Sequence, residues 1–338
     1  MDAISIDLAS APYRMFALDT DEAGRPSQEG AAELRQLISR SRLVYGQAYN
    51  AGNEARKSGV PFIGVVEYDL RTQITANTCN TDNPIRKLVR ATRTVVGHFA
   101  DELPGLAGAA ALHCNGYPIY DAMTRRHANC LLYLDSRVRS DMVIGPEELG
   151  ARLADRPRRR PKLLYSGRFA RMKGACDVVA TGILMLKSGL AFELHLYGQG
   201  PEKARMQAMI DEHGAGHAIQ IHDALPFPQL FEISKSFDLF VCCHIQSDPS
   251  CTYLEAHGAG LAIAGYDNRM WRRLCGEARS GIISPMGDPG GLAQRIIAFV
   301  GSPDFDPACR QARKFASEHS FESEFERRVT DIRVHLAA

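Results

Sequence analysis

The feature that most constrains the fold is an alternation of short apolar segments with longer amphipathic ones. Four strand-like segments, RLVYGQAY, PFIGVVEYDL, GAAALHCNGYP and NCLLYLDSRV, precede five more, KLLYSG, FELHLYG, IQIHD, LFVCCH and LAIAGY. Helical patterns such as PEKARMQAMIDEH lie between them. This alternation is typical of α/β domains with parallel sheets, whose crossover connections are helices. We therefore predict an α/β chain with two Rossmann-like halves.

A polar, arginine-rich segment separates the two halves. Residues 151–162, ARLADRPRRRPK, contain two prolines and indicate an interdomain linker. We predict an N-terminal domain at residues 1–157, a C-terminal domain at 158–318, and a helix at 319–338 that packs back toward the N-terminal domain. The last segment, SFESEFERRVTDIRVHL, spaces its apolar residues at helical intervals.

Composition excludes several classes of protein. The 338 residues carry a formal charge of +1, with 45% hydrophobic and 23% charged residues, which argues against a dedicated nucleic-acid binder. No apolar run is long enough for a membrane span, and the first residues lack a signal-peptide pattern. Nine scattered cysteines indicate reduced thiols, and the adjacent Cys242 and Cys243 do not form a metal-binding pattern. We predict a cytoplasmic protein without a metal site.

Two loops that follow predicted strands are rich in glycine, and the first of them also carries cations. In GRFARMKG, Gly167 lets the backbone turn, and Arg168 and Lys173 can grip one anion from two sides. In GQGPE, Gly198 and Gly200 allow a close backbone approach before a helix. Each loop alone is more often a plain turn with solvated charge, but ligands of such sheets bind at the carboxyl ends of successive strands.

A third loop, QSDPSCTYLEAHGAG, follows the strand LFVCCH. Asp248 suits a helix N-cap and Pro249 the first helical position, so the N–H groups of Ser250, Cys251 and Thr252 should be free. Free N–H groups at a helix N-terminus bind phosphate. The third loop therefore predicts a phosphate site.

Together, GRFARMKG, LHLYGQGPE and LEAHGAGLAIAGYDN resemble the donor-binding domain of GT-B glycosyltransferases of family 4 (group 1), over roughly residues 162–301. The resemblance implies two Rossmann-like domains facing across a cleft, and retention of the anomeric configuration. It implies that Arg168 and Lys173 hold the diphosphate of a nucleotide sugar, and that Glu255 is the second glutamate of an E-x7-E motif that binds sugar and ribose. DALPFPQL, with Leu225, should contact the base. The donor would be a UDP-sugar sooner than a GDP-sugar, with no further cofactor.

The sequence departs from the family pattern at two places. Ser247 stands where the motif expects its first glutamate, and Asp248 follows it. The N-terminal domain is short and opens without the usual glycine-rich loop. Either Ser247 and Asp248 contact the donor sugar in another way, or this domain has lost part of its contact with the sugar. The two departures support an alternative function, a non-catalytic nucleotide-sugar-binding or partner subunit. A nucleotide-sugar 2-epimerase of the same architecture fits the loops less well. Glu255 has an alternative role as a buried acid paired with a cation.

Catalytic candidates lie at strand ends of the N-terminal half. Glu67 and Asp69 end VVEYDL, and His113 lies in LHCNGY. Related enzymes often carry a histidine followed by an acid after the strand that corresponds to VVEYD. A carboxylate there could orient the acceptor hydroxyl or accept its proton, or it could simply cap a loop. The alternative for His113 is packing at the strand end.

The segment PIRKLVRATRTVVGHF predicts an amphipathic helix around residues 85–99. Its apolar residues share one face and its arginines a neighbouring one. Such a helix either packs in the core or lies on an anionic membrane, where lipid-linked acceptors are found. We expect sugar transfer from a nucleotide-diphosphate sugar to a hydroxyl of a glycan or lipid-linked glycan, with peripheral contact to the inner face of the membrane as a possibility.

Overall fold

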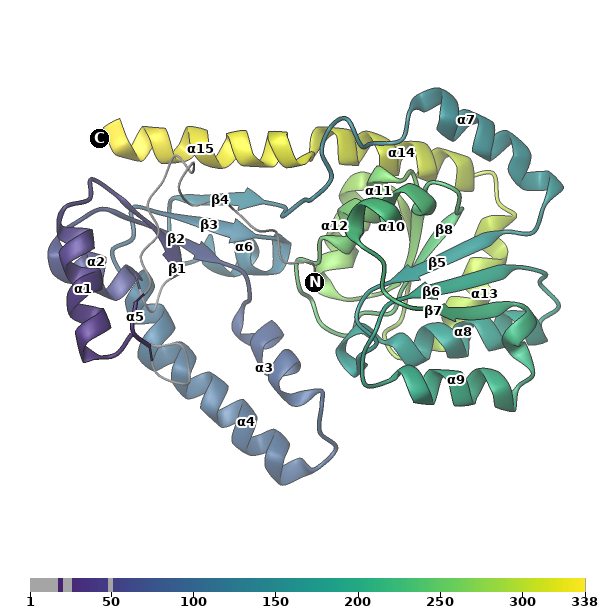
Figure 1. Ribbon diagram of the computed structural model, residues 1–338, viewed down its shortest axis with the longest axis horizontal. Helices are drawn as coiled ribbons and strands as arrows, with labels where there is room; N and C mark the ends of the chain where they lie inside the picture. The colour runs from purple at the N-terminus through teal and green to yellow at the C-terminus, as the bar shows by residue number, and fades with distance from the viewer. Residues whose placement is uncertain (1–17, 21–25, 48–50, 338) are drawn as a thin grey trace.

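The computed structural model describes residues 18–20, 26–47 and 51–337. It contains two α/β domains, seen side by side in Figure 1. The first domain comprises helices α1 (Gln28–Ser39), α2 (Asn53–Ser58), α3 (Leu70–Thr78), α4 (Pro84–Gly97), α5 (Leu103–Leu106) and α6 (Tyr117–Met123), and strands β1 (Val44–Gln47), β2 (Phe62–Val66), β3 (Ala111–Asn115) and β4 (Cys130–Tyr133). A π-helical turn, His98–Glu102, joins α4 to α5.

The first sheet is parallel and has the order β1-β2-β3-β4 among the described residues. Its central strands β2 and β3 are buried along almost their whole length, because helices cover them and apolar side chains fill both faces. Phe62, Leu106, Leu112 and Ile119 lie in the core of this domain. The four strands that the sequence predicts here are confirmed.

The second domain is larger. It comprises strands β5 (Lys162–Ser166), β6 (Glu193–Tyr197), β7 (Ile219–His222), β8 (Leu239–Cys242), β9 (Ala262–Tyr266) and β10 (Gly281–Ser284), and helices α7 (Pro146–Asp155), α8 (Ala175–Lys187), α9 (Lys203–Glu212), α10 (Phe227–Ser234), α11 (Thr252–Gly258), α12 (Arg269–Ala278), α13 (Pro289–Val300) and α14 (Phe305–Glu318). The sequence pattern predicted five of these strands and missed β10.

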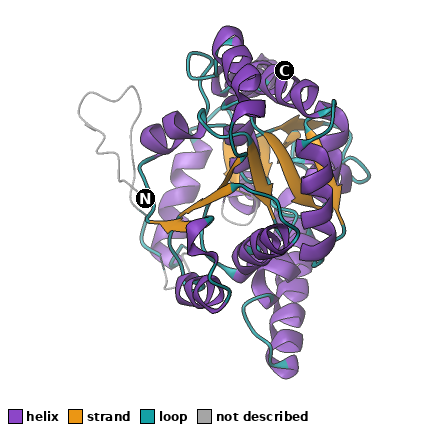
Figure 2. Ribbon diagram, turned by 90° about the vertical axis from the view of Figure 1, so that its right-hand side faces the viewer, coloured by secondary structure: helices purple, strands orange, loops and turns teal. Residues whose placement is uncertain are grey.

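The second sheet is also parallel, with the order β10-β9-β8-β5-β6-β7. The strand order reverses beside β5, so a crevice opens between the loops that follow β5 and β8. Helices lie on both sides of the strands, as Figure 2 shows. The α/β prediction with two parallel sheets is confirmed.

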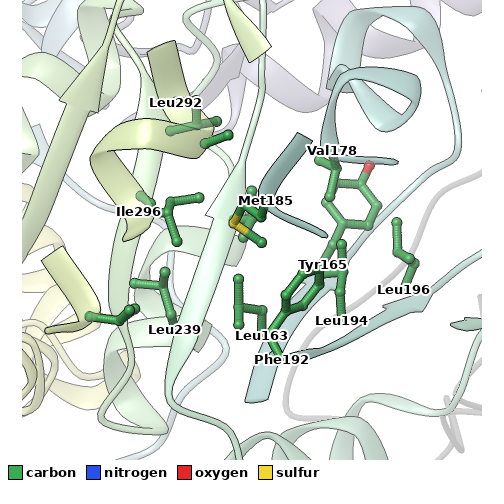
Figure 3. Packing of buried hydrophobic residues seen from close by; sticks show 14 of the residues in the cluster. Leu163, Tyr165, Val178, Met185, Phe192, Leu194, Leu196, Leu239, Leu292 and Ile296 are labelled. Carbon is green, nitrogen blue, oxygen red and sulfur yellow. The ribbon is translucent and has the colours of Figure 1, made fainter. Parts of the chain in front are cut away.

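A continuous apolar core holds the second domain together (Figure 3). Side chains from β5, β6, β8, α8 and α13 meet in it, among them Leu163, Tyr165, Val178, Met185, Phe192, Leu194, Leu196, Leu239, Leu292 and Ile296. Tyr165 is fully buried and stacks between Phe169 and Phe240, at ring-centroid distances of 6.1 and 6.4 Å. A rigid core of this kind fixes the carboxyl ends of the strands, where the loops of interest begin.

The last helix, α15 (Phe321–Ala337), crosses from the second domain to the first and lies along β4 (Figure 1). Polar contacts attach it: Arg327 donates to the Leu132 carbonyl oxygen at 2.9 Å, and Asp331 Oδ2 lies 2.9 Å from His113 Nε2. Phe325 is half exposed, although its spacing predicts an inward-facing residue. The helix docks mainly through its polar side.

The predicted linker at residues 151–162 differs from the structure. Its first five residues belong to α7, whose Leu149 and Leu153 lie in the core of the second domain. Arg152 is largely buried and donates to three backbone carbonyl oxygens, and Arg159 forms a bidentate ion pair with Asp238. Arg152 and Arg159 therefore anchor this segment, because guanidinium groups with several hydrogen bonds tolerate partial burial, whereas Arg158 and Arg160 are exposed.

Candidate functional site

The two glycine-rich loops after β5 and β6 interlock. A Cβ on Gly198 would lie 1.9 Å from the Gly167 carbonyl oxygen, and one on Gly200 would lie 2.4 Å from the Phe169 carbonyl oxygen. Gly167 and Gly200 also adopt positive φ angles of 152° and 153°. A side chain would clash at Gly198, would strain the backbone at Gly167, and would do both at Gly200. The three glycines therefore allow this close backbone approach. The packed loops present Arg168 at the surface, exposed to solvent.

Lys173 does not stand free beside Arg168. Its Nζ donates to Asp248 Oδ2 at 2.6 Å, and both side chains are largely buried. The other carboxylate oxygen, Asp248 Oδ1, and His244 Nδ1 lie 3.8 Å apart, and both lack a hydrogen-bond partner within the described chain. Burial lowers the pKa of His244 far below its ordinary value, and the charge of Lys173 lowers it further. A neutral His244 therefore lies beside the Lys173–Asp248 pair.

The predicted start of the third-loop helix is wrong. α11 begins at Thr252 with Cys251 as its N-cap, so Asp248 and Pro249 lie before it. The Asp248 carboxylate pairs with Lys173 because a buried charge gains more from an ammonium group than from a backbone N–H. Ser250 and Thr252 bond to each other through their hydroxyl groups at 3.1 Å, and Ser247 Oγ accepts the Arg269 N–H at 3.2 Å. The cap and first-turn assignments of Asp248 and Pro249 are therefore wrong, and the phosphate site at this helix stays a prediction.

Glu255 has a cationic partner that comes from the other side of the cleft. Arg137, in the segment after β4, donates to Glu255 Oε1 through Nε at 2.9 Å and Nη2 at 2.5 Å. The same guanidinium group lies 4.4 Å above the ring of Phe227, which begins α10 just after the loop in which Leu225 is exposed. Burial raises the pKa of Glu255, while Arg137 opposes this shift. In this structure Glu255 is a buried acid paired with a cation, the alternative left open above.

Two acidic side chains, Glu67 and Asp135, lie with Asn115 at the carboxyl ends of the strands of the first sheet, and these three residues are called the acidic group below. Glu67 follows β2, Asn115 ends β3, and Asp135 follows β4. The Asp135 N–H donates to Asn115 Oδ1 at 3.1 Å. Burial raises the pKa of Glu67, the charge of Asp135 adds to the rise, and a hydrogen bond from Asn115 opposes it, although the Glu67 side chain still reaches solvent. A carboxylate with a raised pKa suits proton transfer or binding of a hydroxyl group.

The other two catalytic candidates are engaged elsewhere. Asp69 caps α3 and forms a bidentate ion pair with Arg269 of the second domain, at 2.6 and 2.8 Å. Burial opposes ionisation of Asp69, but the hydrogen bonds from Arg269 and Thr72 outweigh it and lower the pKa of Asp69. His113 is fully buried beneath α15, and burial lowers its pKa. The structure brings only Glu67 of the three to the acidic group.

The acidic group of the first domain faces the loops that follow β5 and β8 in the second domain. Cys251 Sγ donates to Asp135 Oδ2 at 3.4 Å, which links the third loop to β4. The pKa of Tyr68 is raised by burial and by the charges of Asp248 and Glu67, and lowered by Arg168, so these groups share one electrostatic environment. A cavity of about 650 Å³ opens beside Arg137, Phe227 and Asp135. Its walls come from the segment after β4, from α10 and from Phe321, and they do not include Glu67, Arg168, Lys173 or Glu255.

Sequence reasoning missed Asp135, Arg137 and His244. Asp135 and Arg137 directly follow the strand pattern NCLLYLDSRV, and the rule that ligands lie at carboxyl ends of strands could have identified them. Nothing in the sequence pairs Arg137 with Glu255, because they are 118 residues apart. Among the residues that the structure describes, no cluster of three or more histidine, cysteine, aspartate or glutamate side chains could hold a metal ion, and no helix could cross a membrane.

Comparison with known proteins identifies the family of the second domain. Residues 154–318 match the family model for glycosyl transferases group 1. The GtfA subunit of UDP-N-acetylglucosamine–peptide N-acetylglucosaminyltransferase from Streptococcus gordonii is 24% identical over 145 residues, which is 43% of this chain and 28% of that protein. The alignment thus leaves most of that relative's length unmatched.

Solved structures extend the likeness to the first domain. Anabaena HepE, solved in complex with UDP, is 13% identical with a TM-score of 0.66, over 90% of this chain and 82% of its own. Sucrose-phosphate synthase from Thermosynechococcus elongatus is 15% identical with a TM-score of 0.65, over 98% and 84%. At these identities the likeness concerns the fold. The chain has the GT-B fold of two Rossmann-like domains, the first of them shortened, and its second domain belongs to the glycosyl transferases group 1.

Proposed function

We propose that this protein is a retaining glycosyltransferase that transfers a sugar from a UDP-sugar to a hydroxyl of a glycan or lipid-linked glycan. One observation carries the proposal. The loops after β5, β6 and β8 bring Arg168, Lys173 and Glu255 to one edge of the second sheet, opposite Glu67 and Asp135 of the first. Departure of a diphosphate requires cations, which are Arg168 and Lys173 here. Attack by a hydroxyl requires a carboxylate to accept its proton, and Glu67 and Asp135 are the carboxylates on the opposite side.

The donor side supplies positive charge for the leaving group. Arg168 is exposed, and its side chain makes no hydrogen bond or ion pair within the described ranges, so it is available to the diphosphate. Lys173 contributes the second charge, shared with Asp248. Two cations can stabilise a leaving diphosphate without a divalent metal ion. We therefore expect transfer to continue in the presence of a chelator.

Asp248 replaces the missing first glutamate of the motif in this proposal. It is 7% exposed, and its Oδ1 has no hydrogen-bond partner in the described chain. A buried carboxylate oxygen without a partner is costly, so a sugar hydroxyl that donates to it is favoured. His244 Nδ1, also buried and unpartnered, can bind a second hydroxyl. These two groups support direct contact with the donor sugar.

Glu67 acts on the acceptor side. Its raised pKa makes it a better proton acceptor than an ordinary carboxylate, and Asn115 holds it in place. In the proposed reaction Glu67 accepts a hydrogen bond from the attacking hydroxyl. Asp69 and His113 keep structural roles, at the α3 cap and beneath α15.

A second candidate function has a specific observation in its favour. The groups expected to bind the donor are paired within the protein, Lys173 with Asp248 and Glu255 with Arg137. A non-catalytic partner subunit could keep such pairs permanently closed. The two functions differ in one measurable way, since only a transferase releases UDP when donor and acceptor are both present.

The test is a UDP-release assay with a panel of UDP- and GDP-sugars, extracts of glycans and lipid-linked glycans as acceptors, and EDTA. The proposal predicts release that depends on acceptor and on a UDP-sugar, and loss of release in Arg168→Ala. Lack of release with every donor, together with intact UDP binding, would instead establish the non-catalytic function.

We also infer that α4 contacts an anionic membrane. The structure buries no residue of this helix, so the alternative of an amphipathic core helix is wrong. Its apolar face is open, with Ile85 at 72% and Leu88 at 68% exposure, and α4 extends away from both sheets (Figure 1). The helix carries three arginines and a lysine and no acidic residue. An exposed apolar face flanked by cations favours an interfacial helix.

Sedimentation with vesicles tests this contact. Phosphatidylglycerol vesicles should bind the protein, and phosphatidylcholine vesicles should bind it weakly. Leu88→Glu should release it, and Val334→Glu, at an equally exposed position on α15, should not. Equal binding of both variants would refute a role for α4.

A further inference from the structure

An arginine-lined groove lies apart from the groups assigned to the donor. Two adjoining cavities, of about 540 and 250 Å³, share Asp69, Arg71, Ala122 and Arg125 in their walls. They lie between the start of α3, helix α6 and the start of α12. The two cavities adjoin at these shared residues, and together they are here called the arginine groove.

The arginine groove carries excess positive charge. Its walls include two aspartates, Asp69 and Asp121, and six arginines: Arg71, Arg125, Arg126, Arg269, Arg272 and Arg273. Three of these arginines are held by carboxylates, in the pairs Arg269–Asp69, Arg272–Asp267 and Arg273–Asp121. The excess charge therefore comes from the other three.

Those three arginines have no side-chain partner in the part of the chain that the structure describes. The side chains of Arg71, Arg125 and Arg126 are exposed and make no hydrogen bond or ion pair with any residue in the described ranges. Arg71 and Arg125 both line the two cavities. Arginines that line the same cavities carry like charges and repel one another, so an anion bound between them is favoured.

The groove connects the donor loop to α4. At one end the Arg269 N–H donates to Ser247 Oγ, directly beside Asp248. At the other end Phe99, just beyond α4, lines the smaller cavity and is 56% exposed. A molecule in the groove would therefore lie between Arg269, whose N–H holds Ser247, and Phe99 at the end of α4.

We propose that the arginine groove binds a phosphate group of the acceptor, with Arg71 and Arg125 as its direct contacts. The planar guanidinium fork matches phosphate oxygens in a bidentate manner, which favours this anion. The word acceptor rests on the proposed transferase function. The phosphate belongs either to the headgroup of a lipid-linked acceptor or to a free phosphorylated glycan, and both present the same chemistry.

The experiment measures phosphate binding without relying on catalysis. Glycerol 3-phosphate is titrated by calorimetry at constant ionic strength into the full chain, its Arg168→Ala variant, the double variant Arg71→Ala/Arg125→Ala, and the matched control Arg295→Ala/Arg310→Ala on the exposed faces of α13 and α14. The groove variant should bind at least about tenfold more weakly, since each lost charge-assisted contact contributes on that scale. The Arg168 variant and the control should bind like the wild type.

Vesicles that contain phosphatidic acid provide the second arm. Loss of both soluble and vesicle binding in the groove variant supports a phosphate site open to either source, and loss of vesicle binding alone assigns the phosphate to a lipid headgroup. Unchanged binding in both arms, or an equal loss in the control, overturns the proposal. A titration with UDP distinguishes the failure of the groove proposal from the failure of the proposed function. Phosphate binding in the groove without UDP binding refutes only the donor site. UDP binding without phosphate binding in the groove refutes only the groove.

Discussion

Replacement of Arg137 by alanine should strengthen UDP binding. In the structure Arg137 donates twice to Glu255 Oε1, the carboxylate that the proposal assigns to the ribose. A ribose hydroxyl cannot use the same lone pairs until the arginine moves. While this pair is formed, Oε1 is taken and Oε2 is left for a ribose hydroxyl, so a nucleotide that binds through both carboxylate oxygens has to displace Arg137 first.

The size of the effect follows from the exposure of the pair. A hydrogen bond between charged groups contributes about 1.5 to 3 kcal/mol, but the Arg137 side chain is 55% exposed, so screening reduces the figure to about 1 kcal/mol. Removal of this competition should tighten UDP binding about fivefold. The free energy of unfolding should fall by about 1 to 3 kcal/mol, because Glu255, at 11% exposure, loses its partner.

A double-mutant cycle with Glu255→Gln checks the reasoning. UDP affinity is measured by calorimetry for the wild type, Arg137→Ala, Glu255→Gln and the double variant. The gain from Arg137→Ala should vanish in the Glu255→Gln background, since no carboxylate remains to be released. Arg139→Ala, which breaks only an exposed pair with Asp141, is the control. Weaker UDP binding in Arg137→Ala would show that the arginine itself contacts the nucleotide and would refute the competition.

Three further outcomes are expected. Lys173→Ala should weaken UDP binding by about 1.5 to 3 kcal/mol and also lower the melting temperature, because Asp248 is left buried without its partner; unchanged affinity would remove Lys173 from the donor site. Glu67→Gln should keep UDP affinity and lower the transfer rate about 100-fold or more, whereas the exposed Glu148→Gln should change neither; wild-type transfer would exclude Glu67. Burial lowers the pKa of His257 to about 3, so between pH 6.5 and 3 the unfolded chain binds a proton that the folded chain does not. The free energy of unfolding therefore falls by about 1.4 kcal/mol for each unit by which the pH is lowered in this range. In urea unfolding at pH 7 and 5, the free energy of unfolding of His257→Leu should fall by about 2 kcal/mol less than that of the wild type, and equal losses would refute this.

Much of the fold could be predicted from the sequence because local patterns determine it. The strands are short apolar runs, and Gly167, Gly198 and Gly200 mark loops where backbone segments approach closely. The strand β10 was missed, and its length of four residues does not explain this, because β1, β4, β7 and β8 are equally short and were predicted.

The errors concern side chains whose partners are distant in sequence. Asp248 has the sequence signature of a helix cap, yet its carboxylate forms an ion pair with Lys173, which lies 75 residues earlier. Asp69 looked available for catalysis, but Arg269 lies 200 residues further along the chain and pairs with it. The Arg137–Glu255 pair depends on how the two domains are placed. Local pattern identifies the residue types at strand ends, whereas long-range ion pairs decide which of them remain free.

The measurement that tests the account most directly is a calorimetric titration of UDP into the wild type and into Arg168→Ala. Arg168 is exposed and has no described partner, so its removal should change the nucleotide site without a loss of stability. The account predicts one UDP per chain in the wild type and binding weaker by about tenfold or more in the variant, with equal melting temperatures. Absence of UDP binding in the wild type, or equal affinity in the two proteins, would contradict it.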